Sequence, residues 1–364
     1  MRLEASLPLE RKPLSRQAAD VIRHQIRSGE LTDPLPGEIQ FAARLGISRP
    51  VLRDALRELA AEKLIVTAKG RRTRILRRRG SASRLRRPRI LALSPTRSGV
   101  PLRLGSTVLD ELRHRLEADG YRWTALSDGR LRTRNPAQLL DELVPPGAYD
   151  AVLLHGSTEA MQQWAFASGT PALVLGSSIP GIALPSVDTD YRALGWHAAG
   201  RLAAAGCRQV SVLYRTPLRQ GDKATIEGLQ AFMGRRSSGG GSLVLQALSG
   251  GVEETCLQLE RMFRRPTRPD ALMFFQPEDA VIALTYFLQT RRRIPGEIAL
   301  VSRESVPLMA AMVPELTRYG SNEEQLIRQT LRVIQSLGHR PPGHRTEIRI
   351  APRFVRGHTL RSDG

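Results

Sequence analysis

Cysteine and long apolar runs are scarce in this sequence. The two cysteines, Cys207 and Cys256, are too few for a disulfide framework, so we expect reduced, buried thiols with a structural role. No apolar run reaches the roughly 18 residues that a membrane-spanning helix needs. The first residues also lack the hydrophobic core of a signal peptide. These absences predict a cytoplasmic protein with no membrane partner.

Acidic residues are missing from a long basic stretch. None occurs between Glu62 and Asp110, where the sequence has 14 lysines and arginines. The whole chain has a net charge of +20, and residues 1–88 hold 21 basic residues against nine acidic ones. A surplus of this size and position points to a polyanionic partner, which is either nucleic acid or an anionic surface.

Signatures of common catalytic sites are absent as well. The sequence has no P-loop and no G-x-G-x-x-G cradle, and no G-x-S-x-G elbow activates Ser157 near His155. His339 and His344 flank Arg-Pro-Pro-Gly, but no third ligand completes a zinc site. We therefore predict a protein that is not an enzyme and that needs neither a cofactor nor a metal.

The first 77 residues have the pattern of a small helical domain that ends in a hairpin. Three helices and then two strands are predicted over residues 14–31, 38–45, 49–63, 65–67 and 72–76. Apolar residues recur at three- and four-residue spacing in the first helix. Gly46 ends the second helix, and Ser48 is the expected N-cap of the third. This order predicts a winged helix-turn-helix.

The third predicted helix divides into two faces. Its apolar face carries Leu52, Ala55, Leu56 and Leu59, and the opposite stripe carries Arg49, Arg53 and Arg57. An arginine stripe alone is typical of a solvated helix face, but the three-helix frame and the basic hairpin favour DNA binding. When such a helix enters a major groove, its arginines can reach guanine edges or phosphates. The predicted DNA contacts are Ser48, Arg49, Pro50, Val51, Arg53 and Arg57 in the helix, with Lys69, Gly70, Arg71 and Arg72 in the wing.

Residues 35–65 also resemble the DNA-binding signature of the GntR family of transcriptional regulators. The similarity covers about residues 13–77 and includes a Pro-Gly-Glu start, a Leu-Gly-Ile-Ser-Arg turn and a Leu-Arg-Asp-Ala-Leu-Arg helix. It implies that Arg49 and Arg53 contact bases or phosphates. Ile39 stands where the family has an arginine, and Pro50 and Val51 replace its common threonines. The resemblance therefore does not supply the operator sequence.

The pattern changes after a basic linker at residues 78–88. Apolar runs suited to buried parallel strands occur at 89–93, 151–154, 172–175, 210–213, 243–247, 271–275 and 298–301. Helical patterns separate several of these runs, at 108–118, 194–205, 223–233, 252–263 and 280–289. This alternation predicts an α/β fold with doubly wound sheets.

About residues 89–360 resemble the periplasmic-binding-protein-like effector domain of LacI-type repressors, as in the arabinose-repressor-like GntR subgroup. The similarity is carried by residues 169–176, 187–206, 293–301, 314–317 and 352–357. It implies a two-lobed α/β domain with three crossovers, an effector cleft between the lobes and dimerisation through this domain. Other GntR-type partner domains fit less well. An all-helical domain lacks the strands, a chorismate-lyase-like domain is shorter, and an aminotransferase-like domain needs a pyridoxal lysine where only Lys223 is available.

Open α/β sheets bind ligands at the carboxyl ends of their strands. This rule predicts effector contacts from Ser94, Arg97, His155, Asp188, Arg215, Gln276 and Glu304. Three sugar-binding positions of the LacI-type family fall on changed residues, namely Thr225, Gln276-Pro277 and Arg303-Glu304. We therefore expect either an unusual effector or a vestigial pocket. Arg97, Arg215 and Arg303 would suit an anionic metabolite, whereas the resemblance itself implies a sugar.

The sequence thus predicts three parts. These are a winged helix-turn-helix DNA-binding domain (1–77), a basic linker (78–88) and a LacI-type effector-binding and dimerisation domain (89–364). The leading hypothesis is a transcriptional repressor that binds a palindromic operator on double-stranded DNA as a homodimer and is gated by a small-molecule effector. The alternative is a constitutive DNA-binding protein with a vestigial sensor domain.

Overall fold

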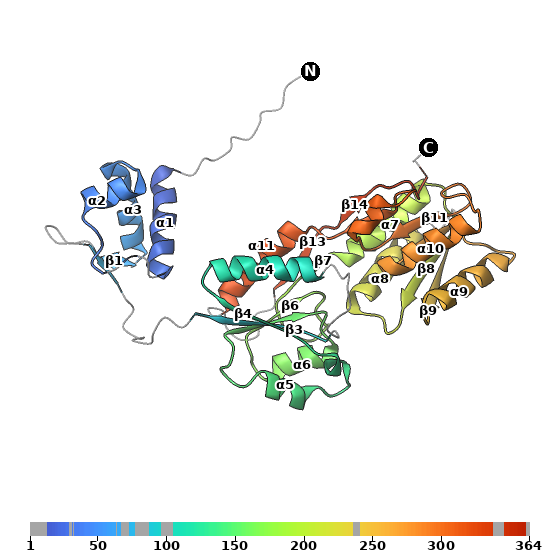
Figure 1. The fold of residues 1–364 in the computed structure, drawn as a ribbon, viewed down its shortest axis with the longest axis horizontal. Helices are drawn as coiled ribbons and strands as arrows, with labels where there is room; N and C mark the ends of the chain where they lie inside the picture. The colour runs from blue at the N-terminus through green and yellow to red at the C-terminus, as the bar shows by residue number, and fades with distance from the viewer. Residues whose placement is uncertain are drawn as a thin grey trace, which may run out of the picture. The chain divides into compact units, whose positions relative to one another are not determined.

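The computed structural model describes residues 13–28, 31, 33–62, 64–66, 73–76, 87–95, 105–235, 241–337 and 346–361. The chain divides into two compact units, Met1–Arg87 and Pro88–Gly364 (Figure 1). Among the helices of the described residues, none has both the length and the apolar character needed to cross a membrane.

The N-terminal unit consists of three helices and a short hairpin. The helices are α1 (Leu14–Ser28), α2 (Glu38–Leu45) and α3 (Arg49–Ala61), and the antiparallel strands are β1 (Ile65–Val66) and β2 (Arg74–Ile75). Ile22, Phe41 and Leu52 lie at the centre of a single apolar core. The predicted winged helix-turn-helix is confirmed, although α1 ends at Ser28, just before Gly29, rather than at residue 31.

The larger unit contains two sheets, which we call lobe 1 and lobe 2 together with their helices. The strands of lobe 1 are β3 (Arg89–Ser94), β4 (Arg122–Ser127), β5 (Ala151–His155), β6 (Ala172–Leu175), β7 (Ser186–Thr189) and β13 (Glu347–Ile350). They pair in parallel in the order β13-β7-β6-β5-β3-β4. Its helices are α4 (Gly105–Ala118), α5 (Ala137–Leu143), α6 (Glu159–Ala167) and α11 (Glu323–Leu337).

Lobe 2 repeats this architecture. Its strands are β8 (Gln209–Arg215), β9 (Ser242–Leu248), β10 (Ala271–Phe274), β11 (Ala299–Ser302), β12 (Thr317–Gly320) and β14 (Arg353–Val355). Their order is β14-β12-β11-β10-β8-β9, and β14 alone among these strands pairs antiparallel to its neighbour. Its helices are α7 (Tyr191–Ala204), α8 (Gln220–Arg235), α9 (Val252–Arg264) and α10 (Pro277–Gln289). The predicted two-lobed α/β fold is confirmed.

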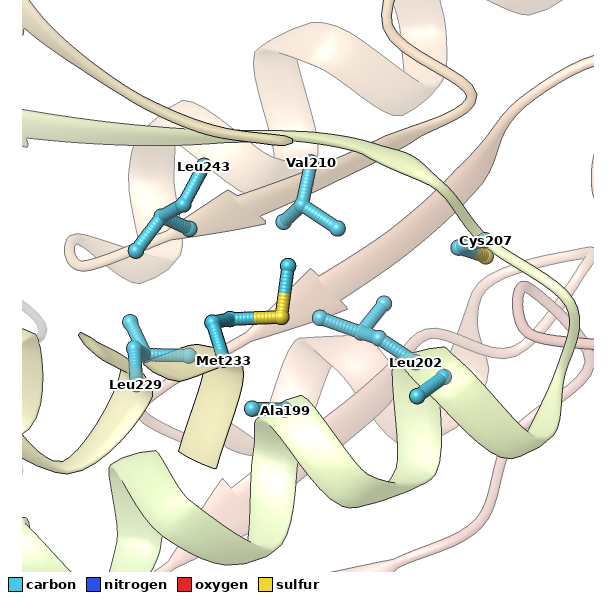
Figure 2. Close-up of a pocket in the computed structure, with 8 residues that line it drawn as sticks. Ala199, Leu202, Cys207, Val210, Leu229, Met233 and Leu243 are labelled. Atoms are coloured by element: carbon cyan, nitrogen blue, oxygen red, sulfur yellow. The ribbon is translucent and has the colours of Figure 1, made fainter. Parts of the chain in front are cut away.

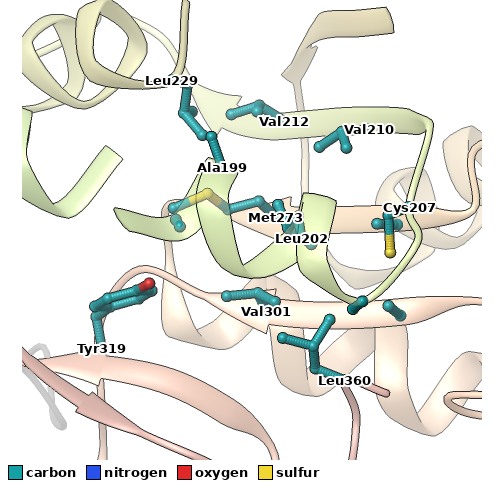
Figure 3. Packing of buried hydrophobic residues seen from close by; sticks show 14 of the residues in the cluster. Ala199, Leu202, Cys207, Val210, Val212, Leu229, Met273, Val301, Tyr319 and Leu360 are labelled. Atoms are coloured by element: carbon teal, nitrogen blue, oxygen red, sulfur yellow. The ribbon is translucent and has the colours of Figure 1, made fainter. Parts of the chain in front are cut away.

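Helices cover both faces of each sheet, which explains the continuous apolar runs in the sequence. In lobe 1, Ile90 and Ala92 face α4 and α11, whereas Leu91 and Leu93 face the side of α5 and α6 (Figure 1). In lobe 2, the strand residues that pack against α7 and α8 alternate with those that pack against α9 and α10. Figure 3 shows Val210, Val212 and Met273 beside α7 in this core.

The chain passes between the lobes three times, as the LacI-type resemblance implied. The passages follow β7, β12 and β13. They are tied to one another by a hydrogen bond between the hydroxyls of Thr189 and Ser321 (3.0 Å) and by one from the Asp190 amide to the Ile350 carbonyl (2.8 Å). These bonds fix the place where the lobes join, beside the carboxyl ends of the strands.

Two glycines let helices α7 and α8 cross in backbone contact. A Cβ atom at Gly195 would lie 2.1 Å from the Thr225 carbonyl oxygen, and one at Gly228 would lie 2.1 Å from the Arg192 carbonyl oxygen. No real Cβ atom approaches an oxygen so closely, so any side chain here must push the helices apart. Glycine is therefore required at this crossing for packing rather than for its backbone angles.

A shallow crevice lies between α7, α8 and the strands β8 and β9 of lobe 2 (Figure 2). Its apolar lining includes Leu202, Met233 and the buried thiol of Cys207. Its volume of about 10 Å³ holds at most one water molecule, so it is not an effector site. Cys207 and Cys256 are both free thiols, but only Cys207 is buried as expected, whereas Cys256 is half-buried. Burial raises the pKa of Cys207 to about 11.

The crossing of α7 and α8 generates a stability prediction. Gly228→Ala should lower the free energy of unfolding by at least about 2 kcal/mol, because the methyl group overpacks the backbone of α7. Gly234→Ala in the same helix is the matched control, since its Cβ would meet nothing within 4 Å. That control should be neutral or stabilising by up to about 1 kcal/mol. Equal thermal midpoints for the two variants would contradict the close crossing.

Candidate DNA interface and effector cleft

Helix α3 presents its arginines on the face opposite its core. Leu52, Ala55, Leu56 and Leu59 are buried, as predicted. Arg49, Pro50 and Arg53 are exposed, and Val51 is half-buried. Within the described residues Arg49 makes no hydrogen bond or ion pair, so its guanidinium is available to a partner. The exposed N-terminal half of α3 is therefore free to contact another molecule.

The other two arginines of α3 are paired with neighbouring carboxylates. Arg53 Nε donates to Glu38 Oε2 at 2.8 Å, and Arg57 lies 2.8 Å from Asp54 Oδ1. Both arginines are more than half exposed, so these pairs are weak and solvent-screened. A phosphate or a base edge could therefore replace either carboxylate.

The turn between α2 and α3 has the geometry that a helix-turn-helix needs. Gly46 has a φ of 64°, a left-handed conformation that suits glycine and closes α2. Ser48 occupies the N-cap position of α3, as predicted, but its hydroxyl makes no capping hydrogen bond. The Ser48 hydroxyl is exposed at the start of α3. The predicted wing contacts Lys69, Gly70, Arg71 and Arg72 lie outside the described residues.

The predicted effector residues lie at the carboxyl ends of parallel strands in both lobes. In lobe 1, β3 ends at Ser94, β5 ends at His155, and β7 has Asp188 as its last residue but one. In lobe 2, β8 ends at Arg215, and Gln276 and Glu304 each lie two residues after the end of a strand, β10 and β11 respectively. Arg97, His339 and His344 lie outside the described residues. We call the region between these two sets of strand ends the cleft.

Arg215 is not available to an anionic ligand in the way the sequence suggested. Its Nε and Nη2 donate to the two carboxylate oxygens of Asp279 at 3.1 and 2.5 Å, and its Nη1 donates to the Gly250 carbonyl at 2.6 Å. Asp279 is fully buried. The ion pair with Asp279 raises the pKa of Arg215. This arginine therefore neutralises a buried carboxylate and anchors the start of α10.

Thr225 also has a structural position. It lies inside α8, is fully buried, and donates its hydroxyl to the Gly221 carbonyl at 2.8 Å. Its own carbonyl lies under Gly195 of α7. The position that corresponds to a sugar-binding arginine in the resemblance thus holds a helix-packing residue.

Arg303 is the most deeply buried cation of the cleft. Its side chain is 4% exposed, Nη1 donates to Asp222 Oδ1, and Nη2 donates to Glu304 Oε1 at 2.8 Å. Its guanidinium carbon lies 4.4 Å from the ring centroid of Phe275 and 5.0 Å from that of Tyr191. Burial lowers the pKa of Arg303, but Glu304 and Asp222 more than offset this effect and raise it. Arg303 is thus charged and paired with two carboxylates, contrary to the expected anion site, although its buried Nε has no hydrogen-bond partner within the described residues.

Asp188 brings a lobe 1 carboxyl group to the same region. Ser177 Oγ donates to its Oδ2 at 2.5 Å, and the Thr189 amide donates to its Oδ1 at 2.8 Å. Burial and, to a smaller extent, the charge of Glu304 raise the pKa of Asp188 to about 6. The two hydrogen bonds and the charge of Arg303 lower this pKa but do not offset the burial. The structure therefore brings Asp188 and Glu304 together. The sequence did not single out Tyr191, Ser177, Asp222 and Phe275, because no motif links them.

Lobe 1 has a second, more open depression between α4 and α11. It has a volume of about 430 Å³ and is lined by Asp110, Glu111, His114, Arg115, Glu323 and Glu324, among others. Arg115 crosses it to pair with Glu324 at 2.8 Å and with Glu111 at 2.6 Å. This acidic groove lies away from the strand ends and contains none of the predicted effector residues.

Two family models match separate parts of the chain. Residues 14–75 match "Bacterial regulatory proteins, gntR family", and residues 199–360 match "Periplasmic binding protein-like domain". The first range covers α1 to β2, and the second covers most of lobe 2 with the final passages between the lobes. The two matches follow the division into units.

Curated relatives match short segments of the chain. The mannosyl-D-glycerate transport/metabolism system repressor MngR of Escherichia coli is 44% identical over 61 residues, which is 16% of this chain and 25% of that protein. The HTH-type transcriptional repressor NagR of Bacillus subtilis is 41% identical over 63 residues, 17% of this chain and 26% of that protein. The chain thus spans about a quarter of the length of the curated relatives it matches.

Solved structures match the larger unit. The transcription regulator CcpA of Lactococcus lactis superposes with a TM-score of 0.65 at 14% identity, covering 76% of this chain and all of that one. A LacI family transcriptional regulator from Enterococcus faecium with bound ribose gives 0.62 at 17% identity, covering 75% and 98%. These likenesses establish the fold of residues beyond the N-terminal unit. The chain therefore joins a segment similar to the gntR family of bacterial regulatory proteins to a larger unit that is similar to periplasmic-binding-protein-like domains and has the fold of LacI-family regulators.

Proposed function

We propose that this protein is a transcriptional repressor that binds operator DNA through α3 and responds to a small molecule in the cleft. The observation that carries the proposal is the exposed arginine stripe Arg49, Arg53 and Arg57, opposite the buried face of α3 in a gntR-family domain. The net charge of +20 supports an acidic polymer as the partner. Such a regulator acts on the chromosome, so we place it in the cytoplasm.

The proposed DNA contacts are those predicted from the sequence. Arg49 is unpaired within the described residues and lies at the N-terminal end of α3, so we assign it a base or phosphate contact. Arg53 and Arg57 would exchange a weak carboxylate contact for DNA. Ser48, Pro50 and Val51 adjoin them, and the wing residues 69–72 would reach the neighbouring backbone or minor groove.

We further propose that the cleft is the effector site and that the three parts of the chain are residues 1–77, 78–88 and 89–364. LacI-family relatives of the same fold include one with bound ribose and one, from an Arthrobacter species, in complex with lactose. Here the cleft combines Asp188 and Glu304 with Ser94, His155 and Gln276. A ligand held by both lobes would change their separation and thereby the order of the DNA-binding units.

The alternative, a constitutive DNA-binding protein with a vestigial sensor, is favoured by one observation. Arg215 and Arg303 are engaged with carboxylates of the chain itself. An anionic metabolite would have to displace these buried ion pairs, which is why they favour a vestigial sensor. For an effector-gated protein, the same pairs favour a ligand that donates hydrogen bonds, such as a sugar or an amine.

DNA recognition can be tested on the full-length chain with a duplex selected from a random-sequence pool. Arg49→Ala and Arg53→Ala should each cost about 1–3 kcal/mol of binding free energy at that duplex. Arg16→Ala is the matched control, because Arg16 is exposed on α1 and loses the same charge away from α3. Unchanged affinity in both α3 variants, measured by fluorescence anisotropy at fixed salt, would exclude the proposed docking.

The proposed homodimer has a candidate surface on lobe 2. Val244 and Leu245 are exposed on β9, the edge strand of the sheet, and Leu257 is exposed on the following helix α9. Apolar side chains on an exposed edge strand favour pairing with another chain. A dimer would place two α3 helices on half-sites about one helical turn apart.

Disruption of this surface should separate the subunits. We expect Val244→Lys with Leu245→Lys to convert a dimer into a monomer in analytical ultracentrifugation and to weaken binding to a palindromic duplex. Val313→Lys is the control, because Val313 is more exposed than either residue but lies in a loop far along the chain from β9. A dimer that survives the double substitution would place the interface elsewhere.

The pH dependence of stability tests whether Asp188 is desolvated in the cleft. Its pKa rises from the ordinary 3.8 to about 6 on folding, so the folded chain holds a proton that the unfolded chain releases. Stability from this group is therefore present at low pH and is lost between about pH 4 and pH 6. Asp188→Asn should abolish that loss and become more stable than the wild type by on the order of 1–3 kcal/mol above pH 6.

The measurement is the difference between the thermal midpoints of the variant and the wild type from pH 4 to pH 8. The control for the loss of one negative charge is Asp110→Asn, because Asp110 is an exposed carboxylate of lobe 1. A difference between Asp188→Asn and the wild type that does not change with pH would show that Asp188 is solvated.

A further inference from the structure

Four side chains enclose the guanidinium of Arg303, and we call them the cage. Tyr191 and Phe275 cover it with their rings, and Asp222 and Glu304 accept its hydrogen bonds. They come from the start of α7, the first turn of α8 and the residues that follow β10 and β11. All four therefore belong to lobe 2 and lie around the strand ends that face the cleft.

The chemistry of the cage is that of a cation site. A cation within about 6 Å of an aromatic ring centroid is attracted by the ring, and the attraction grows when water is excluded. Carboxylates add charge-assisted hydrogen bonds that match the planar fork of a guanidinium. The cage provides both kinds of contact, and Arg303 uses both. A free guanidinium compound would find the same partners if Arg303 were absent.

The cage also lies against lobe 1. Gly221, next to Asp222, is so close to its surroundings that a Cβ there would lie 2.8 Å from Tyr191 Cδ2 and 3.3 Å from Ser177 Oγ. Ser177 in turn donates to Asp188 at 2.5 Å. The cage thus adjoins Ser177, the residue that donates to the carboxyl group that lobe 1 contributes to the cleft.

We infer that Arg303 is a built-in ligand of the cleft, whose guanidinium occupies a cation site that a free guanidinium compound would otherwise bind. This inference depends on the proposed function, because it assigns the lobe 2 half of the effector cleft to the chain itself. With Arg303 in place, both cage carboxylates accept a hydrogen bond from it and one of their two negative charges is balanced. The cation site on the lobe 2 face of the cleft is thereby filled by the chain itself, and we call this state the occupied form of the cleft.

The test is chemical rescue of the full-length Arg303→Ala variant with methylguanidinium chloride at millimolar concentration. The substitution removes the cation that pairs with the buried Asp222 and the half-buried Glu304, so the variant should melt below the wild type. Methylguanidinium should raise its thermal midpoint in a saturable way, by about 3 °C at ten times the Kd. The wild type should not respond, because its cage is full. Methylurea, which has nearly the same shape but no charge, should have no effect.

A second arginine provides the matched control. Arg318 is also buried and pairs with Glu315 at 2.9 Å, but no aromatic ring is stacked on it within the described residues. Methylguanidinium should stabilise Arg303→Ala more than Arg318→Ala. Equal stabilisation of both variants would show that any arginine-sized space binds the probe, and it would overturn the cage. Absence of any effect on Arg303→Ala would overturn it as well.

If Arg303→Ala does not fold, the double variant Arg303→Ala with Asp222→Asn removes one of the two unpaired charges and takes its place. It retains Tyr191, Phe275 and Glu304, so it should still bind methylguanidinium, although more weakly. A double variant that folds but shows no saturable stabilisation by the probe would likewise overturn the inference.

DNA affinity separates this inference from the proposed function. At the selected duplex, methylguanidinium should change the affinity of Arg303→Ala by about tenfold, a coupling of about 1.4 kcal/mol, and leave that of the wild type unchanged. Stabilisation without a change in affinity would overturn the claim that the cage holds the cleft in an occupied form. If the wild type selects no duplex at all, the proposed function fails, but the thermal rescue still tests whether the cage is a cation site.

Discussion

Burial of both faces of two parallel sheets is the constraint on which the larger unit depends. With helices on each side, strands such as β5 and β10 must be apolar at every position, so charged side chains are displaced to their ends. Parallel pairing then gathers those ends at one edge of each sheet. The three passages between the lobes join at the same edge, where Thr189 and Ser321 meet. The cleft is therefore a consequence of sheet burial, and its chemistry depends on the residue that happens to end each strand.

The same constraint explains which elements could be predicted. The seven apolar runs all became strands. Six of them are buried strands, whose signal no turn or surface helix imitates, whereas the seventh, β9, is an edge strand with Val244 and Leu245 exposed. Strand β4 escaped prediction because it is an edge strand with mixed residues, and β12 escaped because its Arg318 is buried by pairing with Glu315. Helix α11 had the signal of an amphipathic helix in Leu326, Ile327, Val333 and Ile334, and it could have been recognised. In the N-terminal unit the periodicity and the Gly46 turn were sufficient to place every element.

The location of the cleft followed from the sequence, but its charge did not. Arg215 and Arg303 each looked like a contact for an anion, since an arginine at a strand end faces the ligand in an open α/β sheet. Their partners Asp279 and Asp222 lie 64 and 81 residues away along the chain, and no local pattern reports such a pairing. Two carboxylates buried in helices α10 and α8 thus convert a predicted anion site into a neutralised one. A buried acid far along the chain is the information that a single sequence does not provide.

Energetics alone do not explain the ion pairs of the cleft. Removing two charges from water costs several kcal/mol per ion, and a buried pair often contributes little net stability compared with apolar residues of the same size. Breaking such a pair is costly, however, because one charge is left buried without a partner. The contacts of Arg303 therefore specify one arrangement of Tyr191, Asp222, Phe275 and Glu304 more than they stabilise the fold. Since these residues come from four elements of lobe 2 and adjoin Ser177 of lobe 1, a rigid cage there limits how the two lobes can move, and any effector must act within that limit.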